Sequence, residues 1–166
     1  LKRFANCTGR SKGRGWSKRC WKNGRQIESE KMPNSTVLDS FAVLAFLEKE
    51  PGHETVAELF QLAAQGEVAL LMSVVNMGEV WYQIARGHSD AIADEKIAAL
   101  KDLGVNVADA DWQLTRQAAL YKKSGGISYA DCYAAALAKI SNAPVVTGDA
   151  EFKRVEKDVK VRWIGK

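Results

Sequence analysis

Short apolar runs and longer amphipathic segments alternate along the chain from residue 32 to its end. The short runs are rich in Val and Leu and are four to six residues long, which is typical of buried strands. We therefore predict five strands, at Thr36–Asp39, Val68–Ser73, Val105–Ala110, Pro144–Asp149 and Val159–Ile164.

The longer segments have the 3.6-residue period of helices and carry the residues that mark helix ends. Ser40 and Asp111 are in position to cap two of them, and Gly66, Gly87 and Gly104 close three others. In one segment four apolar residues are expected to face the core, namely Ile92, Ile97, Leu100 and Leu103. The predicted helices span residues 40–50, 53–66, 74–87, 89–104, 111–126 and 127–139, with a short helical turn at 150–155.

The alternation of apolar strands with helices predicts an α/β fold with a mainly parallel sheet covered by helices. No apolar run approaches the ~20 residues of a membrane-spanning helix, and no signal-peptide pattern follows the basic N-terminus. We therefore expect no membrane association and a cytoplasmic location. The cysteines, Cys7, Cys20 and Cys132, form no CxxC pair, which argues against a disulfide framework or a zinc site.

Charge divides the chain at Met32. Residues 1–31 contain ten Lys and Arg against two Glu, whereas the remainder has more acidic than basic residues. The first 31 residues also lack a hydrophobic period, so they cannot bury enough apolar surface to offset the entropy of ordering. We expect a disordered or loosely attached basic tail at residues 1–31, followed by one domain at residues 32–166.

Four carboxylates fall where predicted strands end or where helices begin. Asp39 ends the first strand, Asp149 lies at the end of the fourth, and Glu79 is on the helix after the second. Asp131 is near the start of the helix that precedes the fourth strand. The carboxyl ends of parallel strands meet at one edge of a sheet, where ligand groups gather. We therefore expect these acids to lie close together.

Each acid also has a structural interpretation. Asp39 suits a helix cap, Asp149 a turn, and Glu79 a position that interacts with the helix dipole. Asp131 resists such an explanation because its neighbours in YADCYAAA offer little polar surface, and no Lys or Arg lies three or four positions away. A buried, unpaired carboxylate costs several kcal/mol unless it is neutralised or binds a cation.

Four acids at one edge of a sheet would repel one another without a counter-charge. A hard divalent cation such as Mg²⁺ or Mn²⁺ takes oxygen ligands, can polarise a phosphoryl oxygen and lowers the pKa of a bound water. The acids therefore indicate metal-dependent hydrolysis of a phosphodiester. His53 and His88 lie at predicted helix boundaries, where we expect surface residues rather than catalytic bases.

Four segments, in this order and at these separations, resemble a PIN domain, and specifically the VapC-type toxin ribonucleases of toxin–antitoxin pairs. The resemblance covers residues 35–166. Its segments are VLDSFAVLAFLEKEPG with Asp39, SVVNMGEVWYQIARG with Glu79, GISYADCYAAALAK with Asp131 and APVVTGDAEFK with Asp149. It implies a three-layer α/β/α sandwich and endonucleolytic cleavage of RNA, often of structured targets such as transfer RNA.

The resemblance also implies roles for individual residues. Thr147 matches the family's hydroxyl residue that helps to hold the site, and Ser40 matches the small hydroxyl residue after the first acid. Glu151 fits a further acid that some members use. Family members are usually homodimers, and a cognate antitoxin commonly covers or disturbs the acids. The metal site, for Mg²⁺ or Mn²⁺, would comprise Asp39, Glu79, Asp131 and Asp149.

RNA contacts are expected from basic residues around the site, such as Arg86, Lys122 and Lys123, because the acids repel phosphates. The basic tail departs from the family, whose members begin a few residues before the first strand. Two interpretations are open. Translation starts at Met32 and residues 1–31 are upstream sequence read in frame, or the tail binds RNA phosphates while its tryptophans stack on bases.

The sequence thus favours a Mg²⁺- or Mn²⁺-dependent endoribonuclease that is the toxin of a type II toxin–antitoxin pair. One alternative is a module of the same fold that binds RNA or protein without turnover, its acids being structural caps. Metal-linked stability would distinguish the two, since only a true site is stabilised by the ion. Another alternative is an RNA-processing or structure-specific DNA nuclease that uses the same chemistry.

Overall fold

The computed structural model of this chain describes residues 21–22, 25–26 and 34–165, and the chain divides by its contacts into two units, Leu1–Lys31 and Met32–Lys166. In the first unit, strand β1 (Trp21–Lys22) pairs antiparallel with β2 (Arg25–Gln26), where the sequence predicted no strand. Elsewhere the predicted disorder of residues 1–31 lies outside the described residues.

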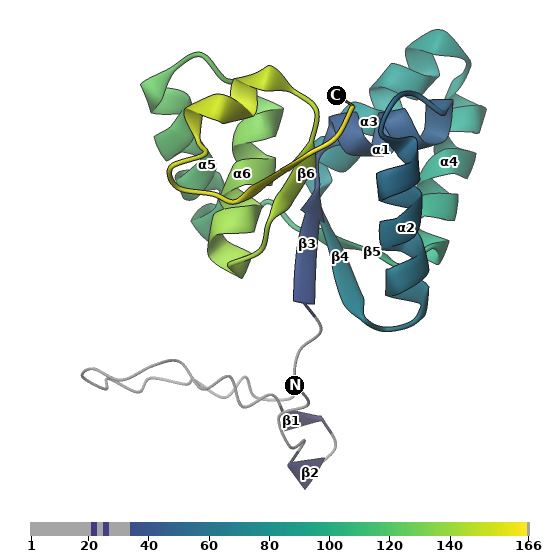
Figure 1. The fold of residues 1–166 in the computed structure, drawn as a ribbon, viewed down its shortest axis with the longest axis horizontal. Coiled ribbons are helices and arrows are strands. Elements are labelled where there is room, and N and C mark those ends of the chain that lie inside the picture. The colour runs from purple at the N-terminus through teal and green to yellow at the C-terminus, as the bar shows by residue number, and fades with distance from the viewer. Residues whose placement is uncertain (1–20, 23–24, 27–33, 166) are drawn as a thin grey trace, which may run out of the picture. The chain divides into compact units, whose positions relative to one another are not determined.

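The second unit is built on a five-stranded sheet, shown edge-on among its helices in Figure 1. Its strand order is β5-β4-β3-β6-β7, and all four pairings are parallel. The predicted sheet is confirmed, although most strands are shorter than expected. The strands are β3 (Asn34–Leu38), β4 (Val68–Ser73), β5 (Val105–Ala108), β6 (Val145–Thr147) and β7 (Val161–Trp163).

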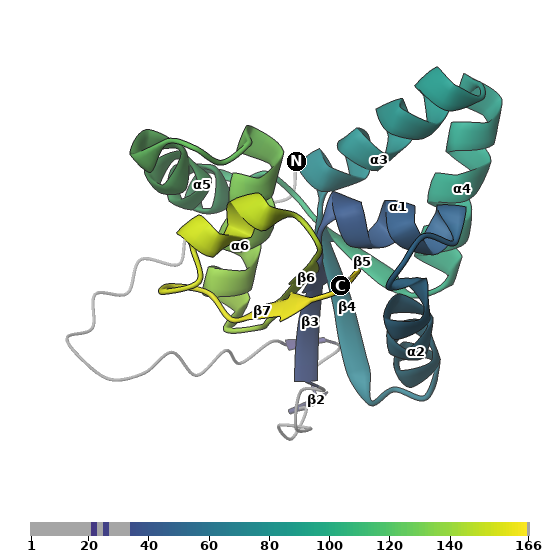
Figure 2. The ribbon, with the colours of Figure 1, turned by 45° about the horizontal axis from the view of Figure 1, so that its top comes forward.

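Helices cover both faces of this sheet, which confirms the predicted α/β/α layers (Figures 1 and 2). In the described part of the chain, every helix is too short or too polar to cross a membrane. The helices are α1 (Ser40–Glu48), α2 (His53–Ala64), α3 (Val74–Gly87), α4 (Asp90–Asp102), α5 (Trp112–Ser124) and α6 (Tyr129–Ser141), with a 3₁₀ turn η1 (Ala150–Arg154) after β6.

Neighbouring residues of the central strands serve different cores. Val37 and Val145 pack with α5 and α6, whereas Leu38 and Val146 pack with α1 to α4. Both faces of these strands are therefore apolar, which explains their unbroken apolar sequence. On α6 every residue from 131 to 138 is buried, and the small side chains among them let the helix lie close to the sheet: Ala134, Ala135, Ala136 and Ala138.

Two local predictions are wrong. Ser40 is the first residue of α1 rather than its cap; Asp39 occupies the cap position, and its side chain makes no capping hydrogen bond. In α4, Ile92 and Leu103 are 39% and 44% exposed. This helix packs against α3 and the edge strand β5, so only a narrow stripe of apolar residues along the helix is buried. The predicted cap at Asp111 is confirmed by a 2.8 Å bond from the Leu114 N–H.

The connections bring the predicted acids to one edge of the sheet. From β3 the chain crosses to β4 on one side, whereas β6 lies on the other side of β3. The direction of winding therefore reverses between β3 and β6, and parallel sheets bind ligands beyond the carboxyl ends of strands at such a point. Asp39 follows β3 and Asp149 follows β6, so these two residues flank it.

Candidate active site

The four predicted acids line a single pocket, although each comes from a different segment. Four hydroxyl, amide or apolar residues from α1 and α3 complete the wall, and among the residues that the structure describes no Lys, Arg or His lines it. The lining residues are Asp39, Ser40, Phe41, Leu44, Glu79, Gln83, Asp131 and Asp149. The expectation that strand direction would gather these acids thus agrees with their observed placement.

Asp39 is the deepest acid of the pocket, with 1% of its surface exposed. Its Oδ2 accepts a hydrogen bond from Thr147 Oγ1 at 2.8 Å, and its Oδ1 accepts one from Asn76 Nδ2 at 3.2 Å. Burial, reinforced by the charge of Asp131, raises the pKa of this carboxyl to about 8, although the Thr147 bond opposes the shift. A buried acid held by two neutral donors still lacks a compensating positive charge.

Asp131 lies in the first turn of α6 and is 6% exposed. Its backbone N–H donates to Ser128 Oγ at 3.1 Å, which caps the helix. Burial raises the pKa of the carboxyl to about 6, and the charges of Asp149, Glu79 and Glu151 add to the rise. The electrostatic effect of these acids shows that they act on one another across the pocket.

Glu79 is held both from α1 and from its own helix α3. Ser40 Oγ donates to Glu79 Oε2 at 2.6 Å, and Tyr82 donates to Oε1 at 3.4 Å. Ser40 therefore serves the site directly through its hydroxyl, and because it begins α1 it ties that helix to α3. This contact is a physical basis for placing Ser40 among the supporting residues.

Asp149 and Glu151 occupy the rim above β6. Asp149 Oδ1 accepts from the Glu151 N–H at 2.8 Å, so this acid also caps η1, as its structural interpretation suggested. Thr147 Oγ1 accepts from the Asp149 N–H at 3.0 Å and thereby links the rim to Asp39. Glu151 does not line the pocket; its Oε2 accepts from the Ser128 N–H at 2.6 Å.

Asn76 was not among the predicted site residues, yet it joins four segments of the pocket. It is fully buried, and its Nδ2 lies 3.2 Å from Asp39 Oδ1, 3.2 Å from Ser40 Oγ and 3.1 Å from the Ala130 carbonyl oxygen. Its Oδ1 accepts from the Ser73 hydroxyl. A signal was present in SVVNMGE: a polar residue among apolar ones, one helical turn before Glu79 and so on the same face.

The chemistry of the pocket suits a hard divalent cation. Its charged groups are carboxylates, the ligands that Mg²⁺ and Mn²⁺ prefer, and burial and the neighbouring acids raise the pKa values of its two most buried carboxyls, Asp39 and Asp131. The positions of these side chains fit a bound cation less closely than their chemistry does. Across the described residues, no three His, Cys, Asp or Glu side chains are gathered into a set that could hold an ion as they stand. Glu79 and Asp149 are instead turned to the donors of Ser40 and Glu151.

Comparison with known proteins decides the family. The family model for the PIN domain matches residues 36–158. The chain belongs to the PIN domain family. A search of curated proteins finds no match.

Solved structures share the fold of this PIN domain. VapBC2 from Rickettsia felis, bound to a DNA fragment from its promoter, is 19% identical; the match covers 78% of this chain and 98% of that chain, with a TM-score of 0.61. VapC20 from Mycobacterium tuberculosis, a toxin that cleaves the sarcin-ricin loop, is 20% identical over 76% and 98% of the two chains, with a TM-score of 0.59. FitAcB from Neisseria gonorrhoeae is 25% identical over 76% and 95%, with a TM-score of 0.55.

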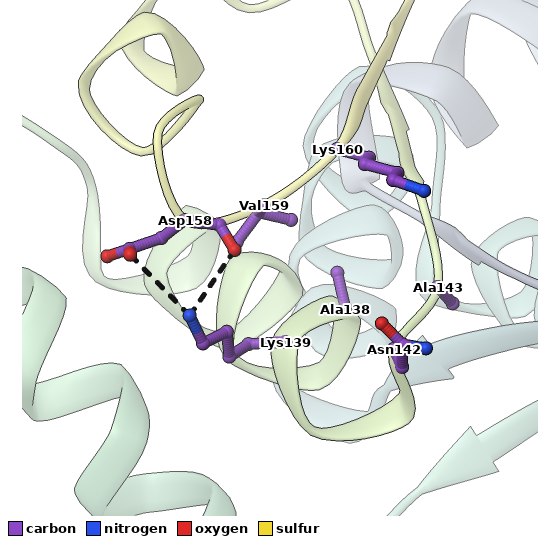
Figure 3. Close-up of a pocket in the computed structure, with 7 residues that line it drawn as sticks. All are labelled: Ala138, Lys139, Asn142, Ala143, Asp158, Val159 and Lys160. Carbon is purple, nitrogen blue, oxygen red and sulfur yellow. Dashed lines mark hydrogen bonds and ion pairs between the residues drawn. The ribbon is translucent and has the colours of Figure 1, made fainter.

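A second pocket of the PIN domain lies at the other end of α6 (Figure 3). It is formed by the last turns of that helix and by residues 158–160, just before β7 begins. Here Lys139 Nζ is 3.5 Å from Asp158 Oδ1, and the two side chains are 46% and 58% exposed. Its one acid is therefore paired with a base, in contrast to the acids of the first pocket.

The other candidate residues lie outside the acid pocket of the PIN domain. Arg86 is in the last turn of α3, and Lys122 and Lys123 are in the last turn of α5; all three are exposed. His53 begins α2 and His88 follows α3, as predicted, and neither contributes to the pocket.

Proposed function

We propose that this PIN domain is a metal-dependent endoribonuclease and the toxin of a type II toxin–antitoxin pair. The observation that carries the proposal is the pocket at the carboxyl edge of the sheet, in which four acids converge and which no basic residue lines among those that the structure describes. Burial, together with the charges of neighbouring acids, raises the pKa values of Asp39 and Asp131, which favours a pocket that receives a cation.

In this proposal Asp39, Glu79, Asp131 and Asp149 hold Mg²⁺ or Mn²⁺. When bound, such an ion lowers the pKa of a coordinated water and offsets the negative charge of a phosphodiester. The chain's own residues supply the orientation: Thr147 and Asn76 hold Asp39 from opposite sides, and Ser40 holds Glu79. Glu151 acts from the rim through its charge on Asp131.

Similar structures support RNA as the substrate and an antitoxin as the partner. VapC20 is described as a toxin that cleaves the sarcin-ricin loop, and several of the similar chains come from VapBC or FitAB assemblies. By analogy, this chain would cleave an RNA, such as a transfer RNA, and a cognate antitoxin would hold it inactive. The proposal also includes that the chain forms a homodimer and acts in the cytoplasm.

The test is cleavage of total RNA by the purified chain with Mg²⁺ or Mn²⁺ and with EDTA, followed by sequencing of the new RNA ends. The proposal expects defined ends that appear only with the ion and that are absent from the Asp131→Asn variant. Cleavage that persists in EDTA would remove the metal from the mechanism.

A module that binds RNA without turnover is the second candidate. It is favoured by the absence, among the described residues, of a ready-made group of three metal-binding side chains. The same assay separates the two, because a binding module would shift RNA in electrophoresis with or without the ion and would leave its length unchanged.

A further inference from the structure

We infer that Arg154 and Lys122 form a phosphate-binding shoulder beside the acid pocket, which holds the RNA backbone through a neighbouring phosphate. The shoulder consists of these two cations and the loop Gly125–Ser128 between them. This inference rests on the proposed function, because it names how a polyanionic substrate is held next to a pocket that carries only negative charge.

Arg154 lies directly on the loop. A Cβ at Gly126 would overlap Arg154 Cζ and Nε and would lie 2.7 Å from Nη1, so the guanidinium packs against the Gly126 backbone. Gly126 also has φ +70°, in the left-handed region that favours glycine. The positive φ favours a glycine at this position, and the missing Cβ leaves room for the flexible Arg154 side chain.

Lys122 is fixed to the same loop from the other side. Its Nζ donates to the Ile127 carbonyl oxygen at 2.8 Å. Both cations are thus held at the segment that leads into the helix carrying Asp131.

Neither cation is neutralised by a salt bridge with any residue that the structure describes. Glu151, which lies on η1 with Arg154, uses Oε2 to accept the Ser128 N–H. In Figures 1 and 2 the yellow-green turn η1, which ends at Arg154, lies over the start of α6 and the end of α5. The shoulder is therefore an exposed surface that carries two cations on the loop leading into the helix of Asp131.

A phosphodiester is the chemistry that fits this surface. A guanidinium presents a planar fork that matches two phosphate oxygens, and an ammonium adds a point charge. The acid pocket repels a polyanion, so binding energy must come from cations beside it. Because such contacts engage phosphates rather than base edges, they hold RNA without regard to its sequence.

The test is binding of labelled single-stranded oligouridylate and oligoadenylate to the full chain in EDTA, measured by fluorescence anisotropy over a range of salt concentrations. Arg154→Ala is expected to weaken both complexes equally, by about threefold to tenfold. It should also lower the slope of log K against log salt by about 0.7. Arg154→Lys should restore part of the salt dependence, since it keeps the charge but loses the fork.

The matched control is Lys160→Ala, which removes one exposed positive charge at the opposite end of α6 (Figure 3). All variants keep residues 1–31, so any contribution of that segment cancels from the differences. Equal affinity and slope in Arg154→Ala and the control would overturn the shoulder, as would failure of the parent chain to bind RNA. Binding that behaves as expected, without cleavage when Mn²⁺ is added, would contradict the proposed nuclease and leave the shoulder standing.

Discussion

The two ends of α6 carry pockets that treat their charges in opposite ways. At its C-terminal end, Asp158 and Lys139 form an exposed ion pair in which each charge balances the other. At its N-terminal end, Asp131 is buried and lines one pocket with Asp39 and further acids. The donors that Asp39 meets there, Asn76 and Thr147, are neutral. An exposed ion pair needs no ligand, whereas buried acids of like charge need protons or a cation.

The largest effect is expected from removing one acid of the buried pocket. Asp131→Asn should lower RNA cleavage by at least about 10²-fold, since it deletes a proposed ligand rather than an outer contact. The fold should persist, because an amide replaces the carboxylate without change of size and relieves repulsion. Cleavage kinetics and thermal unfolding of the same preparation measure both. Cleavage close to the parent rate would contradict the contrast between the buried acids at one end of α6 and the exposed ion pair at the other.

Asn76 tests whether the buried pocket depends on its hydrogen-bond donors. Asn76→Leu should reduce cleavage by about 10- to 100-fold, the cost typical of losing a residue that orients a ligand. It should also lower the free energy of unfolding by about 1–3 kcal/mol, since buried acceptors lose their donor.

The matched control for this substitution is Asn106→Leu on the edge strand β5. Asn106 is an exposed Asn whose Nδ2 donates to two carbonyl oxygens, those of Leu70 and Gly104, and it lies outside the acid pocket. Equal loss of cleavage in both variants, at equal stability, would show that Asn76 has no particular role in orienting Asp39.

The pH dependence of stability should distinguish the two ends in the absence of metal. The pKa of Asp39 is about 8 and that of Asp131 about 6 in the fold, both above the 3.8 of an ordinary Asp. The folded state therefore binds protons more tightly, and stability is lost as pH rises from about 4 to about 8. Thermal unfolding in EDTA should show this fall, and Asp39→Asn should flatten its upper part.

The same pH series contains its own check. Asp158→Asn should leave the slope unchanged, because this acid is exposed and paired. A melting temperature that instead rises with pH over this range in the parent chain would mean that the buried acids are stabilised as carboxylates by the fold itself.

The smallest effect is expected at the Lys139–Asp158 pair. Asp158→Asn should change the free energy of unfolding by less than about 1 kcal/mol, as exposed ion pairs do. RNA cleavage should match that of the parent chain. Denaturant unfolding and the cleavage assay measure the two quantities, and a loss of cleavage comparable to that of Asp131→Asn would show that the pocket in Figure 3 serves the same reaction.

Local sequence patterns predicted much of the fold, and the shared direction of the parallel strands predicted where the acids of the pocket meet. Strand β4 and helix α3 have the predicted bounds because Ser73 caps the helix and a glycine ends it. Asp39 and Asp149 could be placed because any residue that follows a parallel strand lies at the same edge of the sheet. Strand β7 is shorter than its apolar run suggested, since it has a single neighbour, β6.

Contacts between distant segments were beyond the reach of sequence patterns. Asn76 donates hydrogen bonds to Ala130 and Asp39, which are far from it in the sequence. Within its own segment it is only one polar residue among apolar ones. Arg154 was missed in favour of Lys122, Lys123 and Arg86, because the fit of its guanidinium against Gly126 depends on how η1 lies over the loop. The exposure of Ile92 and Leu103 likewise follows from the position of α4 at the edge of the sheet.

The most direct test of the cation site is thermal unfolding of the parent chain, Asp131→Asn and Asp158→Asn with increasing Mn²⁺. The parent chain and Asp158→Asn should be stabilised together, by about 2.7 kcal/mol when the ion reaches a hundredfold excess over its dissociation constant. Asp131→Asn should gain little. A parent chain whose melting temperature ignores Mn²⁺, or an Asp131→Asn variant that rises with it equally, would contradict a cation site at the buried end of α6.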